Sequence, residues 1–137
     1  MRVTLAMVGA LVMSIASSQV VGADASGCSN TACVGVRGNG TWVSQVQGGV
    51  VVDPDQTVTG FSHISGGGID VTTSTETYSN PSGGLLDIKT GPVAYRSDWY
   101  AVNRSVPSGT MVCSTFWKKN PKGDFSAYGT ACETVHS

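Results

Sequence analysis

The stretch "MVCSTFWKKNPKGDFSAYGTAC", residues 111–132, decides the fold because it is typical of a β-hairpin. Two runs rich in aromatic and β-branched residues flank the turn NPKG. Pro121 suits the second position of a type I turn, and Gly123 supplies a positive φ. Counting outward from the turn brings Cys113 within a residue or two of facing Cys132. We therefore expect one β-bulge and a disulfide between these two cysteines.

The same hairpin predicts which side chains face the core, because alternate residues of a strand point to opposite faces. The expected core face consists of Val112, Phe116, Phe125, Ala127 and Ala131. The expected outer face, shared with the cysteines, consists of Met111, Thr115, Trp117, Tyr128 and Thr130. A one-residue bulge would reverse this assignment along part of either strand.

The rest of the chain extends the β pattern. Short runs rich in Val and Thr alternate with turn signals such as Gly38-Asn39-Gly40 and Gly66-Gly67-Gly68. Leucine is scarce after the first 25 residues, and β-branched side chains favour strands over helices. Seven to nine short strands at this spacing predict an all-β fold. We expect a small antiparallel β-sandwich, immunoglobulin-like or related, held by disulfides.

The first 25 residues read as a secretory signal peptide. One positive charge at Arg2 precedes an apolar run, and Ala23-Asp24-Ala25 offers the small residues that a signal peptidase reads. A transmembrane helix is the weaker interpretation, because serines dilute the apolar run and no basic cluster follows it. Cleavage after Ala25 would leave the length of one secreted, extracellular domain, with no membrane attachment afterwards.

Residues 26–40 precede the expected β domain, residues 41–137, and are expected to form an extended N-terminal arm. Four cysteines remain after cleavage, and an even count in a short secreted chain predicts two disulfides. With Cys113 and Cys132 paired across the hairpin, Cys28 and Cys33 pair by elimination. Their small loop would shape the tip of the arm, either as a terminal staple or as a docking element.

Two other roles for these cysteines are weaker. Small residues before Cys28 resemble a bacterial lipoprotein signal, yet lipidation would leave Cys33 unpaired in an oxidising compartment. Metal binding would need further ligands, and the two histidines, His63 and His136, lack a patterned partner. Asp53-Pro54-Asp55 is better explained as a turn than as a calcium ligand set. We expect no metal and no cofactor.

Catalytic patterns are weak, and we expect no enzyme. Ser62 and His63 are adjacent, so on a strand they would point to opposite faces and could not form a nucleophile–base pair. A carboxylate pair could be drawn from Asp70, Asp87 or Asp98, as in any domain with several acids.

Four aromatic residues form a candidate contact patch: Tyr95, Trp99, Trp117 and Tyr128. Such rings among hydroxyl and amide groups stack on sugars or on a protein partner. The alternative is that they are buried between two sheets or paired with each other. The whole chain has eight Lys/Arg and nine Asp/Glu, and this near-neutral balance excludes a nucleic-acid partner.

A resemblance to a known family adds partners to this interpretation. A signal peptide, a Cys-x4-Cys arm, a Gly/Val/Thr-rich β domain and the closing pattern "VPSGTMVCSTFW…YGTACETVH" occur together. In these features the chain resembles the small secreted adaptor subunit of streptomycete umbrella toxin particles. The resemblance implies a bacterial, non-enzymatic adaptor of an antibacterial toxin complex. Its arm would dock into a cleft of a lectin-like subunit, and its β domain would bind the repeat-containing toxin scaffold.

We therefore expect a secreted binding protein that links other proteins through its arm and the edge of its β domain. The expected docking residues of the arm are Ser26, Gly27, Cys28, Ser29, Asn30, Thr31, Ala32 and Cys33. The alternative is a stand-alone carbohydrate-binding module or an inhibitor of a secreted enzyme.

Overall fold

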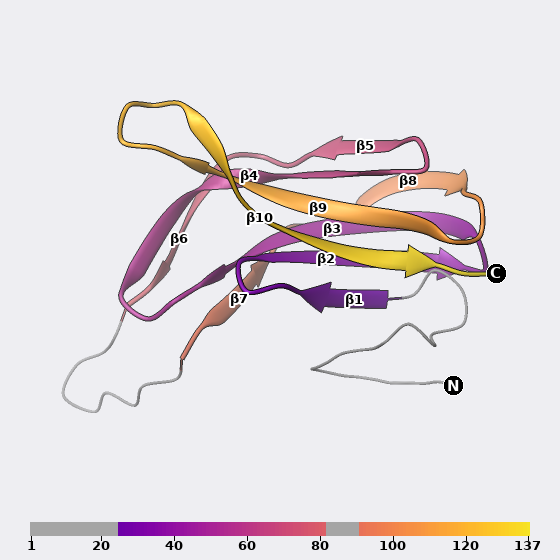
Figure 1. Cartoon of the computed structure of the whole chain (residues 1–137), viewed down its shortest axis with the longest axis horizontal. Helices are drawn as coiled ribbons and strands as arrows, with labels where there is room; N and C mark the ends of the chain where they lie inside the picture. The colour runs from indigo at the N-terminus through magenta and orange to yellow at the C-terminus, as the bar shows by residue number, and fades with distance from the viewer. Residues whose placement is uncertain (1–24, 82–90) are drawn as a thin grey trace.

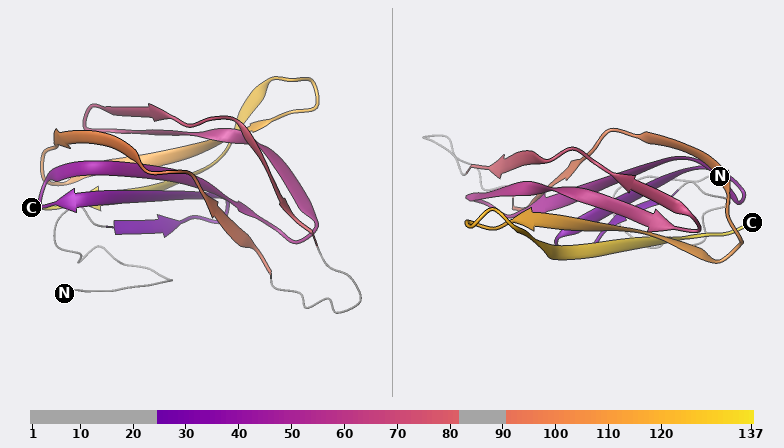
Figure 2. Two further views of the ribbon diagram at one scale, coloured as in Figure 1. Left: turned by 180° about the vertical axis from the view of Figure 1, so that it is seen from behind. Right: turned by 90° about the horizontal axis from the view of Figure 1, so that it is seen from above.

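The computed structural model describes residues 25–81 and 91–137, so the predicted signal peptide lies outside it except for Ala25. The described residues form ten strands and no helix. The strands make two antiparallel sheets that pack face to face (Figures 1 and 2). The predicted all-β antiparallel sandwich is confirmed.

Each sheet is built around one long central strand. In the first sheet β1, β2 and β3 follow in order, and β7 and β8 share the far edge of β3. In the second sheet β10, β9 and β4 follow in order, and β5 and β6 share the far edge of β4. The strands are β1 (Ala25–Cys28), β2 (Ala32–Asn39), β3 (Trp42–Val52), β4 (Gln56–Gly66), β5 (Ile69–Thr72), β6 (Glu76–Asn80), β7 (Val93–Arg96), β8 (Tyr100–Ser105), β9 (Thr110–Lys119) and β10 (Phe125–Val135).

Valine dominates the core between the sheets. Every second residue of a strand points inward, so β-branched residues at alternate positions fill a layered interior without leucine. Phe116 is the largest fully buried side chain among the described residues. The buried cluster consists of Ala32, Val34, Val36, Val43, Val46, Val50, Val52, Val58, Ile64, Ile69, Val106, Val112, Phe116, Ala131 and Val135.

The β9–β10 hairpin has the predicted bulge and the predicted disulfide. Its register shifts between Ala127 and Gly129, which places Cys113 directly opposite Cys132. The two cysteines are bonded, with their Cα atoms 4.0 Å apart. In the turn, the Gly123 amide donates to the Asn120 carbonyl at 2.9 Å, and the φ of Gly123 is +101°. The turn end of the hairpin projects beyond the rest of the sandwich (Figure 1).

The bulge also corrects the predicted faces of β10. Val112, Phe116 and Ala131 are buried as predicted. Phe125, which we expected in the core, is 36% exposed. Ala127 is exposed as well, whereas Tyr128 packs against the core. The physical reason is that the extra residue at position 128 reverses the side-chain alternation for the part of β10 that precedes it.

Candidate functional site

The predicted Cys28–Cys33 disulfide is present, and it closes a tight hairpin between β1 and β2. Cys28 lies opposite Cys33 in the strand register, and their Cα atoms are 4.0 Å apart. Inside the loop the Ser29 hydroxyl accepts the Ala32 amide at 3.0 Å, and the Ser29 amide donates to the Ala32 carbonyl at 2.7 Å. These bonds supply partners for the backbone of the turn, and Cys28, Ser29 and Asn30 remain exposed.

The segment expected as an arm is extended, as predicted, but it is hydrogen-bonded into the domain. β2 pairs along its length with β3, and the boundary predicted at residue 41 falls in the turn between these strands. Cys33 and Val34 are fully buried. The Val51 amide donates to the Thr31 carbonyl at 3.0 Å, so even the loop is tied to the first sheet. The segment is therefore an edge of the domain, as the terminal-staple alternative implies, because its backbone pairs with β3 although it has few apolar side chains.

The second sheet also holds this hairpin. A β-carbon on Gly129 of β10 would lie 1.6 Å from Thr31 Oγ1, so only glycine fits at that point. Nearby, a β-carbon on Gly27 would lie 2.6 Å from Glu133 Oε2. The Glu133 carboxylate thus lies between β1 and β10, where burial raises the pKa of this carboxyl above its usual range.

β1 forms one edge of the first sheet. Within residues 25–81 and 91–137, it pairs only with β2. Ser29 and Ala32 form a hydrogen-bonded pair. Hydrogen-bonded and non-hydrogen-bonded pairs alternate along an antiparallel ladder, so the pairs that contain Cys28 and Ser26 are non-hydrogen-bonded. Their N–H and C=O groups therefore point away from β2. Both residues are exposed, so this backbone edge is open to a further strand.

The outer face of the first sheet carries two arginines. Arg96 of β7 lies opposite Gly49, which in turn lies opposite Cys33. Because Gly49 has no side chain, the Arg96 guanidinium reaches across it to donate to Cys28 Sγ at 3.4 Å. Arg96 as a whole is exposed, and partial burial of its guanidinium lowers the pKa of this group.

The second arginine stacks on an aromatic ring. The guanidinium carbon of Arg37 lies 4.0 Å from the Trp99 ring centroid, and Arg37 Nη1 donates to Gln45 Oε1 at 3.4 Å. The Trp99 indole packs over Gly35 of β2. A β-carbon on Gly35 would lie 2.9 Å from the indole, so the absence of a side chain there makes room for the ring. Gln47 is held beside it by a 2.9 Å bond from its Nε2 to the Ser97 carbonyl.

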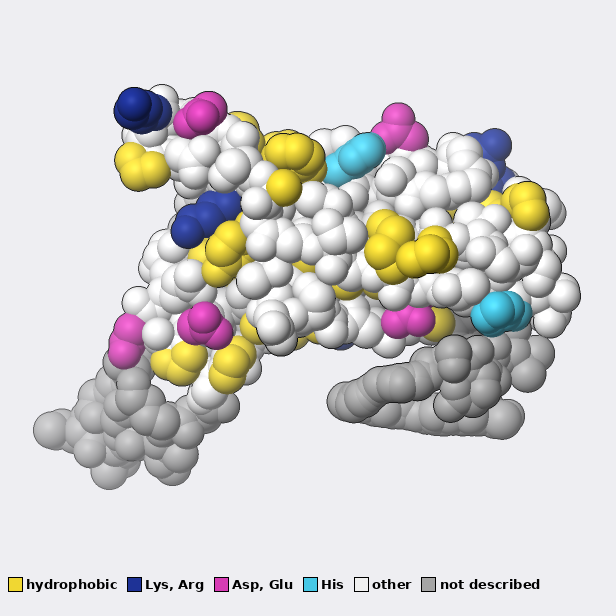
Figure 3. Space-filling view, viewed as in Figure 1, with side chains coloured by type: hydrophobic (Ala, Val, Ile, Leu, Met, Phe, Trp, Pro, Cys, Tyr) yellow, Lys and Arg dark blue, Asp and Glu magenta, His cyan; other side chains and the backbone are white. Residues whose placement is uncertain are grey.

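The four predicted patch residues do not form one patch. Tyr95 packs on Tyr78 at the edge between the sheets, with ring centroids 5.4 Å apart. Tyr128 turns inward to Phe116, and its hydroxyl accepts Gln56 Nε2 at 3.0 Å. Trp99 lies on the outer face of the first sheet, whereas Trp117 belongs to the second. In Figure 3, hydrophobic side chains form small separate groups among polar ones.

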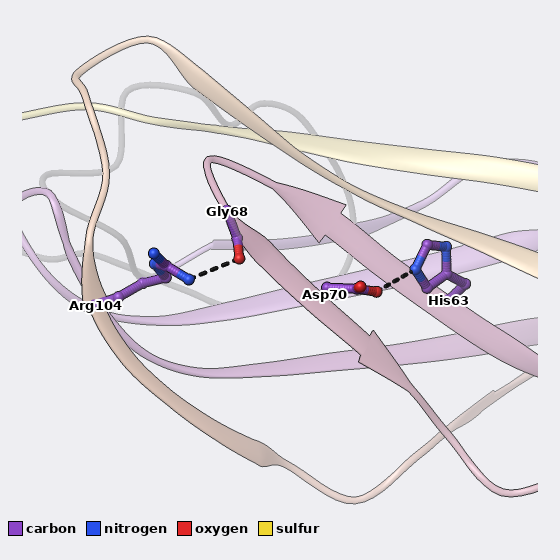
Figure 4. Close-up of polar contacts among 4 residues, drawn as sticks. All are labelled: His63, Gly68, Asp70 and Arg104. Atoms are coloured by element: carbon purple, nitrogen blue, oxygen red, sulfur yellow. Dashed lines mark hydrogen bonds and ion pairs between the residues drawn. The ribbon is translucent and has the colours of Figure 1, made fainter.

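His63 has a partner that the sequence did not reveal. Its Nε2 lies 2.6 Å from Asp70 Oδ1, across the β4–β5 hairpin (Figure 4). Ser62 is buried on the opposite side of β4, and its amide donates to Thr73 Oγ1 instead. The pair could be found only by assigning the Gly66–Gly68 turn, which brings residue 70 beside residue 65. The nearby guanidinium of Arg104 donates to the Gly68 carbonyl.

The remaining predictions concern metals and membranes. Asp53-Pro54-Asp55 forms the predicted turn, with the Gln56 amide donating to the Asp53 carbonyl at 3.1 Å. Residues 25–81 and 91–137 contain no cluster of His, Cys, Asp and Glu able to hold a metal ion. No helix in the same ranges has the length and apolar character needed to cross a membrane. Asp87 lies outside the described residues.

Comparison of the chain with family models, with curated proteins and with solved structures gives no match. The candidate site is therefore defined by its geometry alone. It consists of the open edge of β1, the exposed disulfide tip beside it, and the adjoining outer face with Arg96, Arg37 and Trp99.

Proposed function

We propose that this chain is a secreted, non-catalytic binding protein that links other secreted proteins through the edge of β1. The proposed compartment is supported by the two disulfides, which are typical of oxidising, extracellular environments. The non-catalytic role is supported by the burial of Ser62 on the side of β4 away from His63.

The open backbone edge at Ser26 and Cys28 is the observation that carries this proposal. An extended segment of a partner can add to such an edge and gain main-chain hydrogen bonds without any catalytic group. The Cys28–Cys33 disulfide and the contact between Thr31 and Gly129 hold the edge in place before binding. This order reduces the conformational entropy that would otherwise be lost on docking.

The resemblance to umbrella toxin adaptors gives the proposal its specific form. The partners would then be a lectin-like subunit and a repeat-containing toxin scaffold. Because residues 26–33 belong to the sheet, we propose that they dock as a fixed edge and tip. A free arm that enters a cleft would first have to break the pairing of β2 with β3.

Strand addition can be tested by blocking one outward amide. Ser26→Pro removes the N–H that faces away from β2, and proline is compatible with such an edge position. Ser26→Ala is the matched control, because it removes the hydroxyl and keeps the amide. The wild type and both variants would be used as bait in culture supernatant of the natural source, with thermal unfolding as a check of folding.

We expect the wild type and Ser26→Ala to recover the same partner, and Ser26→Pro to lose it at an unchanged melting temperature. Recovery of the wild type only as a free monomer would contradict the adaptor proposal. Equal recovery by all three forms would instead exclude β1 as the docking edge.

A sugar-binding module is the second candidate, and one group of rings favours it. Trp117 lies opposite Phe61 in the strand register, and the Phe61 and Phe125 ring centroids are 5.1 Å apart. These half-exposed rings lie on the outer face of the second sheet, near the His63–Asp70 pair. Binding to a glycan array that is lost with Trp117→Ala would favour this function over the adaptor role.

A further inference from the structure

We propose that the segment which adds to β1 carries an acidic side chain, aspartate or glutamate, that forms an ion pair with Arg96. This inference rests on the proposed strand addition and specifies the chemistry of the partner. It follows from the charge and the position of the Arg96 guanidinium.

In the part of the chain that the structure describes, the Arg96 guanidinium has N–H donors that no carboxylate accepts. Within residues 25–81 and 91–137, the only polar contact of its guanidinium is the Cys28 sulfur, and no carboxylate pairs with it. Five N–H groups in a planar fork match the two oxygens of a carboxylate.

Among the described residues, no acidic side chain occupies an outward position of β2, β3 or β7. The outward positions of β2, β3 and β7 are occupied by Cys, Gly, Arg, Gln, Asn, Trp, Val and Ala side chains. Asp98 follows β7 and is exposed, but it forms no ion pair with either arginine. Arg37, also without an acidic partner in the described ranges, adds a second positive charge to the same face. This charge is complementary to an acidic ligand.

The position of the guanidinium identifies the ligand as a polypeptide strand. Arg96 starts on β7, yet its tip lies 3.4 Å from Cys28, on the strand that forms the open edge. A strand added to β1 would lie about 4.8 Å beyond it, with alternate side chains on the outer face. A carboxylate on one of these side chains can then meet the guanidinium above the disulfide. An acidic polysaccharide could pair with the Arg96 guanidinium, but it has no peptide backbone to form the hydrogen bonds of an added strand.

Synthetic peptides provide the probe. One extended peptide of alternating threonine and valine carries a central glutamate, and a second carries glutamine at that place. Binding of each labelled peptide to the folded, disulfide-bonded domain would be measured by fluorescence anisotropy. The variant is Arg96→Gln, and Lys122→Gln is the matched control, because it removes the same charge from the exposed turn of the other sheet. Polygalacturonate serves as an anionic polymer without a peptide backbone.

We expect the wild type and Lys122→Gln to bind the glutamate peptide about tenfold more tightly than the glutamine peptide, as a charged hydrogen bond predicts. Arg96→Gln should bind both peptides equally. The same tenfold preference in Arg96→Gln, or an equal loss in both variants, would overturn the ion pair. Binding of polygalacturonate in place of the peptides would overturn the polypeptide assignment.

The outcomes also separate this inference from the proposed function. The wild type could bind both peptides equally and Ser26→Pro could bind neither. This result would support strand addition to β1 and would exclude the ion pair with Arg96. Peptide binding that Ser26→Pro does not affect would place the ligand elsewhere than β1 and overturn both. Failure of the wild type to bind either peptide would overturn both as well.

Discussion

Gly129 of β10 meets Thr31 of the disulfide loop so closely that a β-carbon on residue 129 would lie 1.6 Å from Thr31 Oγ1. This contact joins the tip of the first sheet to the bulged strand of the second. It explains why the N-terminal segment belongs to the domain. Cys28 and Cys33 hold the loop in shape, and Gly129 leaves the space that the loop fills.

We predict that Gly129→Ala destabilises the domain by about 1–3 kcal/mol, the usual cost of overpacking. The physical reason is the steric overlap with Thr31, which the loop can relieve only by moving off β10. Urea unfolding measures the change. In a second step Thr31→Gly is combined with Gly129→Ala, and we expect the double variant to recover most of the loss. An equal cost of Gly129→Ala in both backgrounds would contradict this explanation.

We predict that Glu133→Gln stabilises the protein at neutral pH and not in acid. Partial burial raises the pKa of the half-buried Glu133 carboxyl, so the folded state disfavours its charged form. The wild type therefore loses stability as the pH rises from the ordinary glutamate pKa through the raised pKa of Glu133. Glutamine stays neutral at every pH, so the variant has no such loss. Thermal unfolding of both proteins below the ordinary glutamate range and near neutrality measures the difference.

The Glu133→Gln prediction has a built-in control, because below the ordinary glutamate pKa both side chains are neutral in the folded and the unfolded state. The two melting curves should then coincide. A stabilisation of equal size at both pH values would assign the effect to packing instead of charge.

We predict that Cys28→Ala/Cys33→Ala leaves the sandwich folded but loosens β1. The chain-entropy model assigns about 2 kcal/mol to so small a loop, and β2 remains paired with β3. Amide exchange at Gly27, which faces Val34 in the hydrogen-bonded register, should therefore increase strongly. Amides of β9 should change much less. Uniform loss of protection over both sheets would show that the disulfide supports the whole fold.

We predict that Arg104→Gln destabilises the protein by less than about 1 kcal/mol, the size expected for an exposed charged hydrogen bond. The Arg104 guanidinium in the first sheet donates to the Gly68 carbonyl in the β4–β5 turn at 2.6 Å (Figure 4). It thereby ties the two sheets together at this end of the sandwich. Arg104→Lys, which keeps the charge and one donor, should lose less. Equal stability of all three forms would show that solvent replaces this bond without cost.

Much of the fold was predictable because the signals are local. The turn at Asn120–Gly123, the bulge and the Cys113–Cys132 disulfide follow from residue types at fixed spacing. The side-chain direction of Phe125 did not follow, since it depends on which residue of the strand takes the bulge. Two arrangements with the same local pattern differ only in packing between the sheets.

The candidate site was less predictable because its parts come from separate elements. The exposed tip at Cys28 was identified from cysteine spacing, but its contact with Arg96 joins residues 68 positions apart. Likewise, Trp99 was a candidate contact residue with burial between the sheets as the alternative, and its pairing with Arg37 depends on the order of strands in the first sheet. No local pattern records which strand forms the edge of a sheet.

By itself the sequence determined the fold class, the strand-rich character and both disulfides, because β-branched periodicity, turn residues and cysteine parity act over a few residues. The tertiary structure alone decided that residues 26–33 are an edge of the domain and not an arm. It did so through the ladder between β2 and β3 and the fit of Thr31 against Gly129. The β2–β3 ladder is a local hairpin across the turn at Gly40 and Thr41, whereas the fit of Thr31 against Gly129 joins residues far apart in the sequence, which residue spacing does not encode.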